Sequence, residues 1–539
     1  MRSTVMHARV GAGPGRLATA LAGMLVLALV LGQPAATAAQ PVDATPSPPG
    51  TDAPPKDATA ADPATDLPAR LDAVMARFGD LTGSSTVSVV VTDDQGERIW
   101  SAGPDRALMP ASTMKVLTAA SVLDEFGPTG VVHTGAAATA PVDGDGVVDG
   151  DVVVVGSGDP TLTTDDYRRW IYPSRPSTEI EGLADTIVAA GITRITGDLV
   201  GDGSRFGPSQ TAAGWPERYF ADFDAHRLAS LSVDTGRDVL VDESSSPPRV
   251  VMGHDADPAL GATVALAEAL ADRGVTIDRY ARRSLGPSAG MVPLGRVKSP
   301  PMTEVLGFML RESDNHMADT LVRTAALRET GDGSWSAADG RVREALDGLG
   351  VDTGGLVVAD GSGLSRNNRV TPTQLVLTDV GLTTAFGDTW SSMLAVGGES
   401  GTLQNRLLGT SAQGRLYGKT GTLADVRALV GHVVGTDDAR YHFAMIVNDV
   451  DTGIRYLASV LADELALVLT DALDGCRRVR EVTVEVPAEE GTGAADASPA
   501  PESSDAPAPT ETTTAVPATV DDPGPYLQDG GWQRVCPDD

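Results

Sequence analysis

Three short motifs in this sequence combine the hydroxyl, amine and amide groups that acyl transfer needs. They are Ser-x-x-Lys at Ser112–Lys115, Ser-Asp-Asn at Ser313–Asn315 and Lys-Thr-Gly-Thr at Lys419–Thr422. A serine becomes a nucleophile when an adjacent base takes its proton, and a neutral lysine amine can be that base. Each motif alone is short enough to occur by chance. The chemistry therefore depends on the elements that carry the three motifs.

The first motif lies at the start of an expected helix. Pro110 precedes it, Lys115–Phe126 contains no Pro or Gly, and Gly127 ends the run. The i, i+3 spacing places the Lys115 amine on the same helical face as the Ser112 hydroxyl, and the positive end of the helix favours an alkoxide. A serine N-cap beside a solvated lysine is the alternative interpretation.

The Ser-x-Asn pattern occurs twice in the chain. Ser313–Asn315 follows an apolar helical pattern from Met302 to Leu310 and precedes another over His316–Arg328, which predicts a break between two helices. Ser365–Asn367 follows a glycine-rich stretch and is typical of a turn. We therefore expect the first copy to carry the chemistry.

The third motif is followed by alternating apolar runs at Val426–Val434 and Tyr441–Val447, which predict an edge strand entering a hairpin. On such a strand Lys419 and Thr420 can present a cation and a hydroxyl to a carboxylate. Gly421 would let a substrate backbone approach closely. An ordinary exposed strand end is the alternative.

The order of the three motifs is the one found in penicillin-binding proteins and serine β-lactamases. With Ser299–Pro301, Asp360–Arg366 and Gly401–Leu403, the motifs make residues 67–475 resemble the low-molecular-mass penicillin-binding proteins. Within that family the chain resembles the D-alanyl-D-alanine carboxypeptidases and endopeptidases with a domain inserted between the first two motifs.

The resemblance implies a role for each catalytic group. Ser112 would attack the terminal D-Ala-D-Ala bond of a peptidoglycan stem peptide, with Lys115 as a base kept partly neutral by cationic neighbours. Ser313 and Asn315 would relay the proton to the leaving amine and hold the substrate amide. β-Lactam antibiotics should trap the acyl-enzyme.

The resemblance also implies a set of binding groups. The side chains of Lys419 and Thr420 would bind the terminal carboxylate, and the backbone N–H groups of Ser112 and Thr422 would form the oxyanion hole. Gly421 completes the binding strand. Arg366 and Asp159 would read the charged end of the stem peptide, with turn-stabilising roles as their alternative.

The expected fold is α+β, an α/β sandwich of the serine β-lactamase and penicillin-binding transpeptidase type, with a mostly β insertion rich in Asp-Gly turns. The long separation between the first two motifs requires that insertion. The expected organisation is a signal peptide over 1–38, a disordered linker over 39–66, a discontinuous catalytic domain over 67–135 and 256–480, an inserted domain over 136–255, a disordered linker over 487–525 and a C-terminal segment over 526–539.

The N-terminal residues predict export. Arg2, Arg9 and Arg16 precede the uncharged apolar run Leu17–Leu31, and a small-residue site follows at Ala36–Ala38. The run is shorter than the roughly 20 apolar residues that cross a bilayer. We therefore expect a cleaved secretory signal, no stable membrane span after cleavage and an extracytoplasmic location on the cell-wall side. An uncleaved membrane anchor is the alternative.

Composition and cysteine content limit the other classes of function. A net charge of −32 opposes binding to nucleic acid. Two cysteines are too few for a thiolate metal site or an iron–sulfur cluster, and we expect no metal and no cofactor.

An oxidising exterior permits a disulfide between Cys476 and Cys536, which would tie the segment Tyr526–Val535 to the folded body. Free or intermolecular thiols are the alternative.

Two other functions stay open from the sequence. No Gly-x-Ser-x-Gly elbow accompanies the seven histidines, which argues against a Ser-His-Asp hydrolase. A serine β-lactamase with fast deacylation is the enzymatic alternative, and a slow-turnover cell-wall-binding regulatory protein is the other. The preference for carboxypeptidase or endopeptidase substrates and the oligomeric state are not determined by these patterns.

Overall fold

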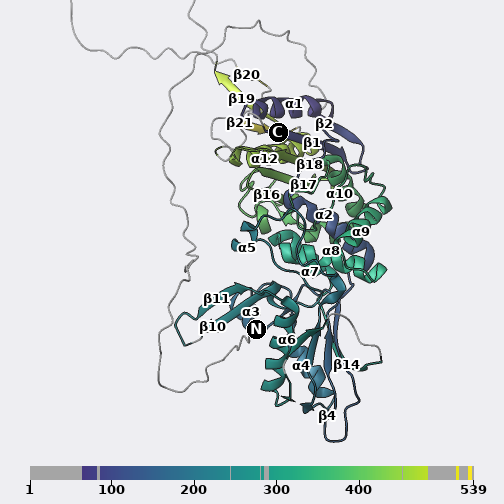
Figure 1. Cartoon of the computed structure of the whole chain (residues 1–539). Coiled ribbons are helices and arrows are strands. Elements are labelled where there is room, and N and C mark those ends of the chain that lie inside the picture. The colour runs from purple at the N-terminus through teal and green to yellow at the C-terminus, as the bar shows by residue number, and fades with distance from the viewer. Residues whose placement is uncertain are drawn as a thin grey trace, which may run out of the picture. The chain divides into compact units, whose positions relative to one another are not determined.

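The computed structural model describes residues 63–81, 85–242, 244–279, 281–284, 290–451, 453, 455–483, 517–520 and 532–536. The expected signal peptide and residues 39–62 of the expected linker lie outside these residues. The last four residues of that linker, 63–66, are instead the start of helix α1 (Pro63–Leu81). The expected secondary structure around the motifs is confirmed, and the elements keep the numbering of Figure 1.

An antiparallel six-stranded sheet forms the centre of the catalytic domain. Its strands, in spatial order, are β15 (Ala395–Val396), β16 (Leu416–Leu423), β17 (Val426–Val434), β18 (Arg440–Asn448), β1 (Thr86–Asp93) and β2 (Arg98–Ala102). The first strand of the domain, β1, thus pairs with its last strand, β18. The sheet joins segments from both sides of the insertion, as the discontinuous domain predicts.

Both faces of this sheet are buried by helices. Val89 and Val91 of β1 pack into a core with α1 (Pro63–Leu81) and α12 (Arg455–Leu473), while Val90 packs on the opposite face. The alternation of side chains along a strand sends neighbouring residues to opposite cores. The helices of the second face are α2 (Met114–Phe126), α7 (Met302–Glu312), α8 (Asn315–Thr330), α9 (Trp335–Gly348), α10 (Pro372–Phe386) and α11 (Asp388–Met393). The result is the expected α/β sandwich.

The inserted domain has a second sheet and its own apolar core. The sheet contains, in spatial order, β13 (Arg282–Ser284), β9 (Leu199–Asp202), β5 (Val152–Val155), β3 (His133–Ala138) and β14 (Val292–Lys298). Helices α4 (Ile180–Ala189) and α6 (Pro258–Asp272) pack on it. Short elements complete this domain: β4 (Val147–Val148), β6 (Leu162–Thr163), β7 (Thr178–Glu179), β8 (Arg194–Ile195), β10 (Arg237–Asp242), β11 (Arg249–His254), β12 (Thr276–Ile277) and α3 (Asp165–Trp170). Helix α5 (Arg218–Ala221) belongs to the same stretch of chain, but its Tyr219 packs with Leu364 and Val426 of the catalytic domain.

The structure corrects the expected C-terminal limit of the insertion. The expected boundary at 255 cuts the domain, because α6 and β14 share its core with β3 and β5. The chain enters on β3 and leaves on β14, and these strands pair antiparallel, so the two connections to the catalytic domain lie side by side. The Asp-Gly turns that marked the insertion end before α6, which explains the early boundary. The domain has more strands than helices, and α4 and α6 cover its sheet.

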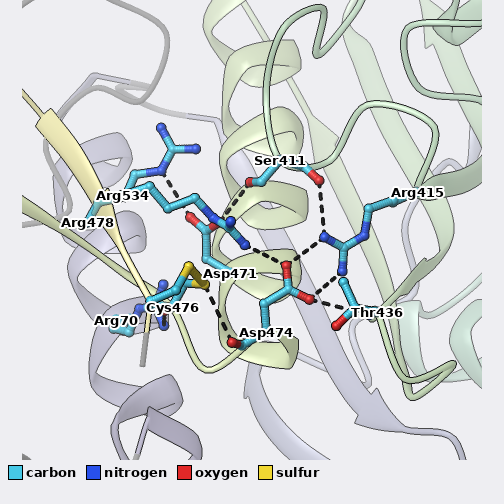
Figure 2. The surroundings of a disulfide bond; sticks show 10 residues. Arg70, Ser411, Arg415, Thr436, Asp471, Asp474, Cys476, Arg478 and Arg534 are labelled. Atoms are coloured by element: carbon cyan, nitrogen blue, oxygen red, sulfur yellow. Dashed lines mark hydrogen bonds and ion pairs between the residues drawn. A yellow bond between two sulfur atoms is a disulfide. The ribbon is translucent and has the colours of Figure 1, made fainter. Parts of the chain in front are cut away.

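The C-terminal strands are fixed to the catalytic domain. Strand β19 (Arg477–Thr483) pairs with β20 (Pro517–Val520) and β21 (Trp532–Val535), and a disulfide joins Cys476 to Cys536. Figure 2 shows the Asp471 carboxylate accepting hydrogen bonds from Ser411 and Arg534 beside this bond. The disulfide is the one expected from the sequence. Strand β20 corrects the expectation that 487–525 is disordered throughout.

None of the helices in the part of the chain described above has the length and apolar character needed to cross a membrane.

Candidate active site

The three motifs meet at one place in the catalytic domain. The Lys115 Nζ lies 3.1 Å from the Ser112 Oγ and 2.8 Å from the Asn315 Oδ1. The Lys419 Nζ lies 2.9 Å from the Ser313 Oγ. The first motif begins α2, the second joins α7 to α8, and the third lies on β16. Residues from distant parts of the chain thus form a single hydrogen-bonded cluster.

The turn that carries Ser112 is held by close backbone contacts. Ser112 occupies a 3-10 turn over Ala111–Thr113 immediately before α2, and Ala111 has a φ of 48°, a conformation that costs a non-glycine residue free energy. A Cβ on Gly421 would lie 2.7 Å from the Pro110 carbonyl oxygen. The glycine of the third motif therefore lets the chain's own backbone approach the nucleophile's turn, besides any substrate contact.

Lys115 is fully buried, and its surroundings define its protonation. Burial lowers the pKa of its amine to about 8, against the opposing effect of the carboxylates of Asp319, Asp360 and Asp314. The expectation that cationic neighbours keep this amine neutral is thus corrected: desolvation is the cause, and its charged neighbours are acidic.

The hydrogen bonds of Lys115 orient its nitrogen. Besides the contact with Asn315, the Nζ donates to the Ser362 carbonyl oxygen at 2.8 Å. A neutral amine has two N–H groups and one lone pair. When both N–H groups bind these two oxygens, the lone pair faces the Ser112 hydroxyl. This is the geometry that a general base requires.

The loop that supplies the Ser362 carbonyl belongs to the segment Asp360–Arg366, which supports the family resemblance, but the sequence did not predict its contact with Lys115. The Asp319 carboxylate accepts hydrogen bonds from the N–H groups of Gly361 and Ser362, at 2.9 and 2.8 Å. A Cβ on Gly363, whose φ is +87°, would lie 1.8 Å from the Ala111 carbonyl oxygen. The glycine-rich sequence was the available signal, but it does not reveal Asp319 as the partner.

The second Ser-x-Asn copy is a turn, as expected. The Ser365 hydroxyl donates to the Ala213 carbonyl oxygen at 2.6 Å, and its Oγ accepts from the Asn367 N–H. The Ser365 hydroxyl thus supports its own turn and links it to the segment that contains Ala213.

Lys419 is a second fully buried amine. Burial lowers the pKa of this amine well below its ordinary value, and the nearby Lys115 lowers it further. Its Nζ also donates to the Thr420 carbonyl oxygen at 2.7 Å, so one of the three N–H groups of the charged form stays available for a substrate. The Thr420 hydroxyl donates to the Thr402 hydroxyl at 2.8 Å, which adds Thr402 to the site.

Strand β16 is an edge strand only in part. Strand β15 pairs with Tyr417 and Gly418, whereas among the described strands only β17 pairs with Lys419–Leu423. The Thr422 side chain is exposed. The second half of β16 thus has one edge at which an extended peptide can add its backbone hydrogen bonds.

Two residues expected to bind substrate have other partners. Arg366 forms a bidentate ion pair with Asp425, at 2.9 and 2.8 Å. Asp159 is 5% exposed and accepts hydrogen bonds from Thr161 and Thr178. These contacts fit the turn-stabilising alternative for both residues.

A separate cluster in the core has the residue types of a metal site. The Asp379 Oδ2 lies 3.0 Å from the His432 Nδ1 and 2.7 Å from the His442 Nδ1, and all three side chains are buried. Trp390 donates to the other carboxylate oxygen at 2.8 Å. Because each histidine lies within hydrogen-bonding distance of Asp379, the N–H groups of the two rings and of Trp390 account for the buried carboxylate without a cation.

Comparisons with known proteins agree with this geometry. The model of the D-Ala-D-Ala carboxypeptidase 3 (S13) family matches residues 67–246 and 241–458. A D-alanyl-D-alanine carboxypeptidase of Actinomadura sp. is 32% identical to this chain, and the match covers 74% of this chain and 85% of that protein. The carboxypeptidase DacB of Mycolicibacterium smegmatis is 34% identical, and the match covers 69% of this chain and 79% of that protein. The crystal structure of penicillin-binding protein 4 from Haemophilus influenzae matches with a TM-score of 0.61 and 21% identity, over 72% of this chain and 96% of that one, which supports the fold.

Proposed function

The chain belongs to the D-Ala-D-Ala carboxypeptidase 3 (S13) family and is a serine-type D-alanyl-D-alanine carboxypeptidase, and we propose that the Ser112 hydroxyl is its nucleophile. In this proposal the Ser112 oxygen attacks the carbonyl carbon of the terminal D-Ala-D-Ala bond while the neutral Lys115 amine takes its proton. The leaving D-alanine accepts a proton, and a covalent acyl-enzyme remains. Water then releases the shortened peptide, with the proton transfers reversed.

Ser313 and Asn315 would complete the proton path. The Ser313 hydroxyl accepts a 2.9 Å hydrogen bond from the Lys419 amine, which would leave its own proton free to pass to the leaving nitrogen. The Asn315 amide binds Lys115 through its oxygen. Both residues thereby act on the same reaction from one turn.

The carboxylate and oxyanion sites lie along β16. Lys419 and Thr420 would bind the terminal carboxylate of the substrate, and the backbone N–H groups of Ser112 and Thr422 would bind the oxyanion. An oxyanion donor typically contributes about 3 kcal/mol to the transition state. A β-lactam has both a strained amide and a carboxylate, so it would acylate Ser112 and inhibit the enzyme.

The observation that carries this proposal is the 3.1 Å contact between the Lys115 amine and the Ser112 hydroxyl, at a lysine whose pKa burial lowers to about 8. The test is labelling of the full chain with a fluorescent penicillin. Ser112→Ala should abolish the label. Ser121→Ala, which removes a buried hydroxyl from the same helix, should leave it unchanged. Equal labelling of Ser112→Ala and the unmodified protein would exclude Ser112 as nucleophile.

The remaining alternatives differ in turnover. A β-lactamase would hydrolyse nitrocefin with many turnovers, whereas the proposed enzyme would stay acylated and release D-alanine from a D-Ala-D-Ala peptide. A regulatory wall-binding protein would do neither at a useful rate. A cross-linked muropeptide offered in the same assay measures any endopeptidase activity. Arg366 and Asp159 receive less support as substrate-binding residues, because their charged groups already bond to other side chains of the protein.

We also propose that the protein acts outside the cytoplasm, on peptidoglycan stem peptides. The support is the signal-like sequence over 1–38 and the disulfide between Cys476 and Cys536, which needs an oxidising compartment. Intact-mass measurement of the exported protein tests it: a mature chain that begins after Ala38 is expected, and a cytoplasmic full-length protein would contradict it.

A further inference from the structure

Two groups of the inserted domain contact the turn Ser313–Asn315. The Arg175 Nη2 lies 3.4 Å from the Asp314 Oδ2, and the Asp224 carbonyl oxygen accepts a 3.0 Å hydrogen bond from the Asn315 amide nitrogen. The side chain of Arg175 is 5% exposed and that of Asp314 is 17% exposed. Water therefore screens this ion pair less than it screens a surface pair.

The turn itself has a conformation that needs support. Ser313 is in the left-handed region, with φ 60° and ψ 36°, which is unfavourable for a residue with a side chain. Asp314 is the N-cap of α8, and its Oδ1 accepts a 2.8 Å hydrogen bond from the Met317 N–H. One carboxylate thus caps α8 with one oxygen and meets Arg175 with the other. When the Asp314 carboxylate is held in place, the backbone that carries the Ser313 and Asn315 side chains is held as well.

Asp159 takes part in holding Arg175. Its carboxylate accepts hydrogen bonds from the Thr161 N–H and hydroxyl and from the Thr178 hydroxyl. These bonds shape the bend that includes Pro160, and the Pro160 carbonyl oxygen accepts a 3.1 Å hydrogen bond from the Arg175 Nη2. The contacts run from Asp159 through Arg175 to Asp314. This explains why a buried carboxylate lies so near the site without facing a substrate.

We propose that Arg175 is a positioning residue for hydrolysis, and that the inserted domain is therefore part of the catalytic apparatus. The inference rests on the proposed function, because it assumes that Ser313 and Asn315 act in the reaction. Without the guanidinium, the Asp314 carboxylate loses its cation and the turn is free to relax. The Asn315 oxygen then no longer fixes the Lys115 amine, which slows acylation more than it weakens substrate binding. A shift of about 1 Å in a catalytic group can cost on the order of 100-fold in rate.

The test compares Arg175→Met with Arg341→Met in the full chain. Arg341 is a matched control: its side chain is 3% exposed, and it pairs with Asp124 near the C-terminal end of α2, nine residues or about 13 Å along the helix from Lys115. For each variant the acylation rate with a fluorescent penicillin, kcat and KM for a D-Ala-D-Ala peptide, and Tm are measured. Arg175→Met should lower acylation and kcat on the order of 30- to 100-fold, with KM changed less than threefold. Arg341→Met should lower Tm and leave acylation within about twofold.

Two further variants separate positioning from loss of folding. Arg175→Lys keeps a cation and should recover part of the rate. Asp314→Asn keeps an N-cap side chain but removes the ion pair, so it should be slow alone and should add little to Arg175→Met in the double variant. Acylation of Arg175→Met at the wild-type rate, or fully additive effects in the double variant, would overturn the inference. Wild-type labelling of Ser112→Ala would instead overturn the proposed function, whatever Arg175 does.

Discussion

At the scale of single residues, the pH dependence of the reaction follows from the buried Lys115 amine. Its pKa is lowered to about 8 by burial, and only the neutral form can take the Ser112 proton. The acylation rate should therefore rise with pH, by about tenfold per pH unit well below 8, and level off above it. Single-turnover acylation by a fluorescent penicillin between pH 6 and 9 measures this. Lys115→Arg should be inactive throughout, and a flat wild-type profile would contradict the role of the amine.

Lys419 should determine the preference for a terminal carboxylate. Its amine has one N–H group left after its bonds to Ser313 and Thr420, and it is fully buried. Lys419→Ala should lower kcat/KM for a D-Ala-D-Ala peptide by about 30- to 100-fold, because a charged hydrogen bond contributes about 2 to 3 kcal/mol. The same peptide with a C-terminal amide is the control. An equal loss for both peptides would show that Lys419 does not bind the carboxylate.

At the scale of elements, the contact between the loop at Gly363 and the nucleophile's turn should be sensitive to a single methyl group. A Cβ there would meet the Ala111 carbonyl oxygen at 1.8 Å, so Gly363→Ala must displace one of the two segments. Acylation should fall by at least about tenfold. Gly350→Ala is the control, because Gly350 has a similar positive φ of +75° but no atom within 4 Å of an added Cβ. It should lower stability by about 1 kcal/mol without slowing acylation.

The elements show what sequence patterns could and could not predict. Helix α2 and the hairpin β17–β18 were predictable, because periodicity and Gly or Pro signals are local. The residues around Lys115 were harder to predict. Asp319 lies within helix α8, and its local sequence does not indicate that it supports the active site. Asp159 was predicted to bind substrate, whereas its hydrogen bonds to Thr161 and Thr178 depend on tertiary packing that the local sequence does not reveal. Periodicity also cannot assign α6 to one of two domains, because its apolar pattern suits either core.

At the scale of the whole molecule, buried histidines should make the protein sensitive to acid. His316 is buried, neither ring nitrogen has a hydrogen-bond partner among the described residues, and burial lowers its pKa to about 3. In the unfolded chain its pKa is about 6.5. The unfolded state therefore binds more protons between these values, and the free energy of unfolding falls as pH drops below 6.5. The loss is on the order of 1 kcal/mol per pH unit for one histidine.

Urea unfolding at pH 7, 6 and 5 measures this acid sensitivity. The pKa of the neighbouring His226 is also lowered by burial and by His316, so both act in the same direction. His316→Gln should flatten the decline, because glutamine does not titrate in this range. An unfolding free energy that is the same at pH 7 and pH 5 would contradict the prediction.

The pairing of β1 with β18 has a consequence for how the polypeptide reaches its native state. Val90 pairs with Ala444, so this contact joins residues that are far apart in the sequence. The core of the inserted domain, in contrast, forms within one uninterrupted stretch of chain. Contacts between residues far apart in the sequence form late in folding, because closing the long loop between them has a large entropic cost. In pulse-labelled hydrogen exchange during refolding, amides of β5 and β9 should gain protection before those of β1. Catalytic competence would then be the last property acquired, after a long-lived intermediate with a finished insertion and an open central sheet.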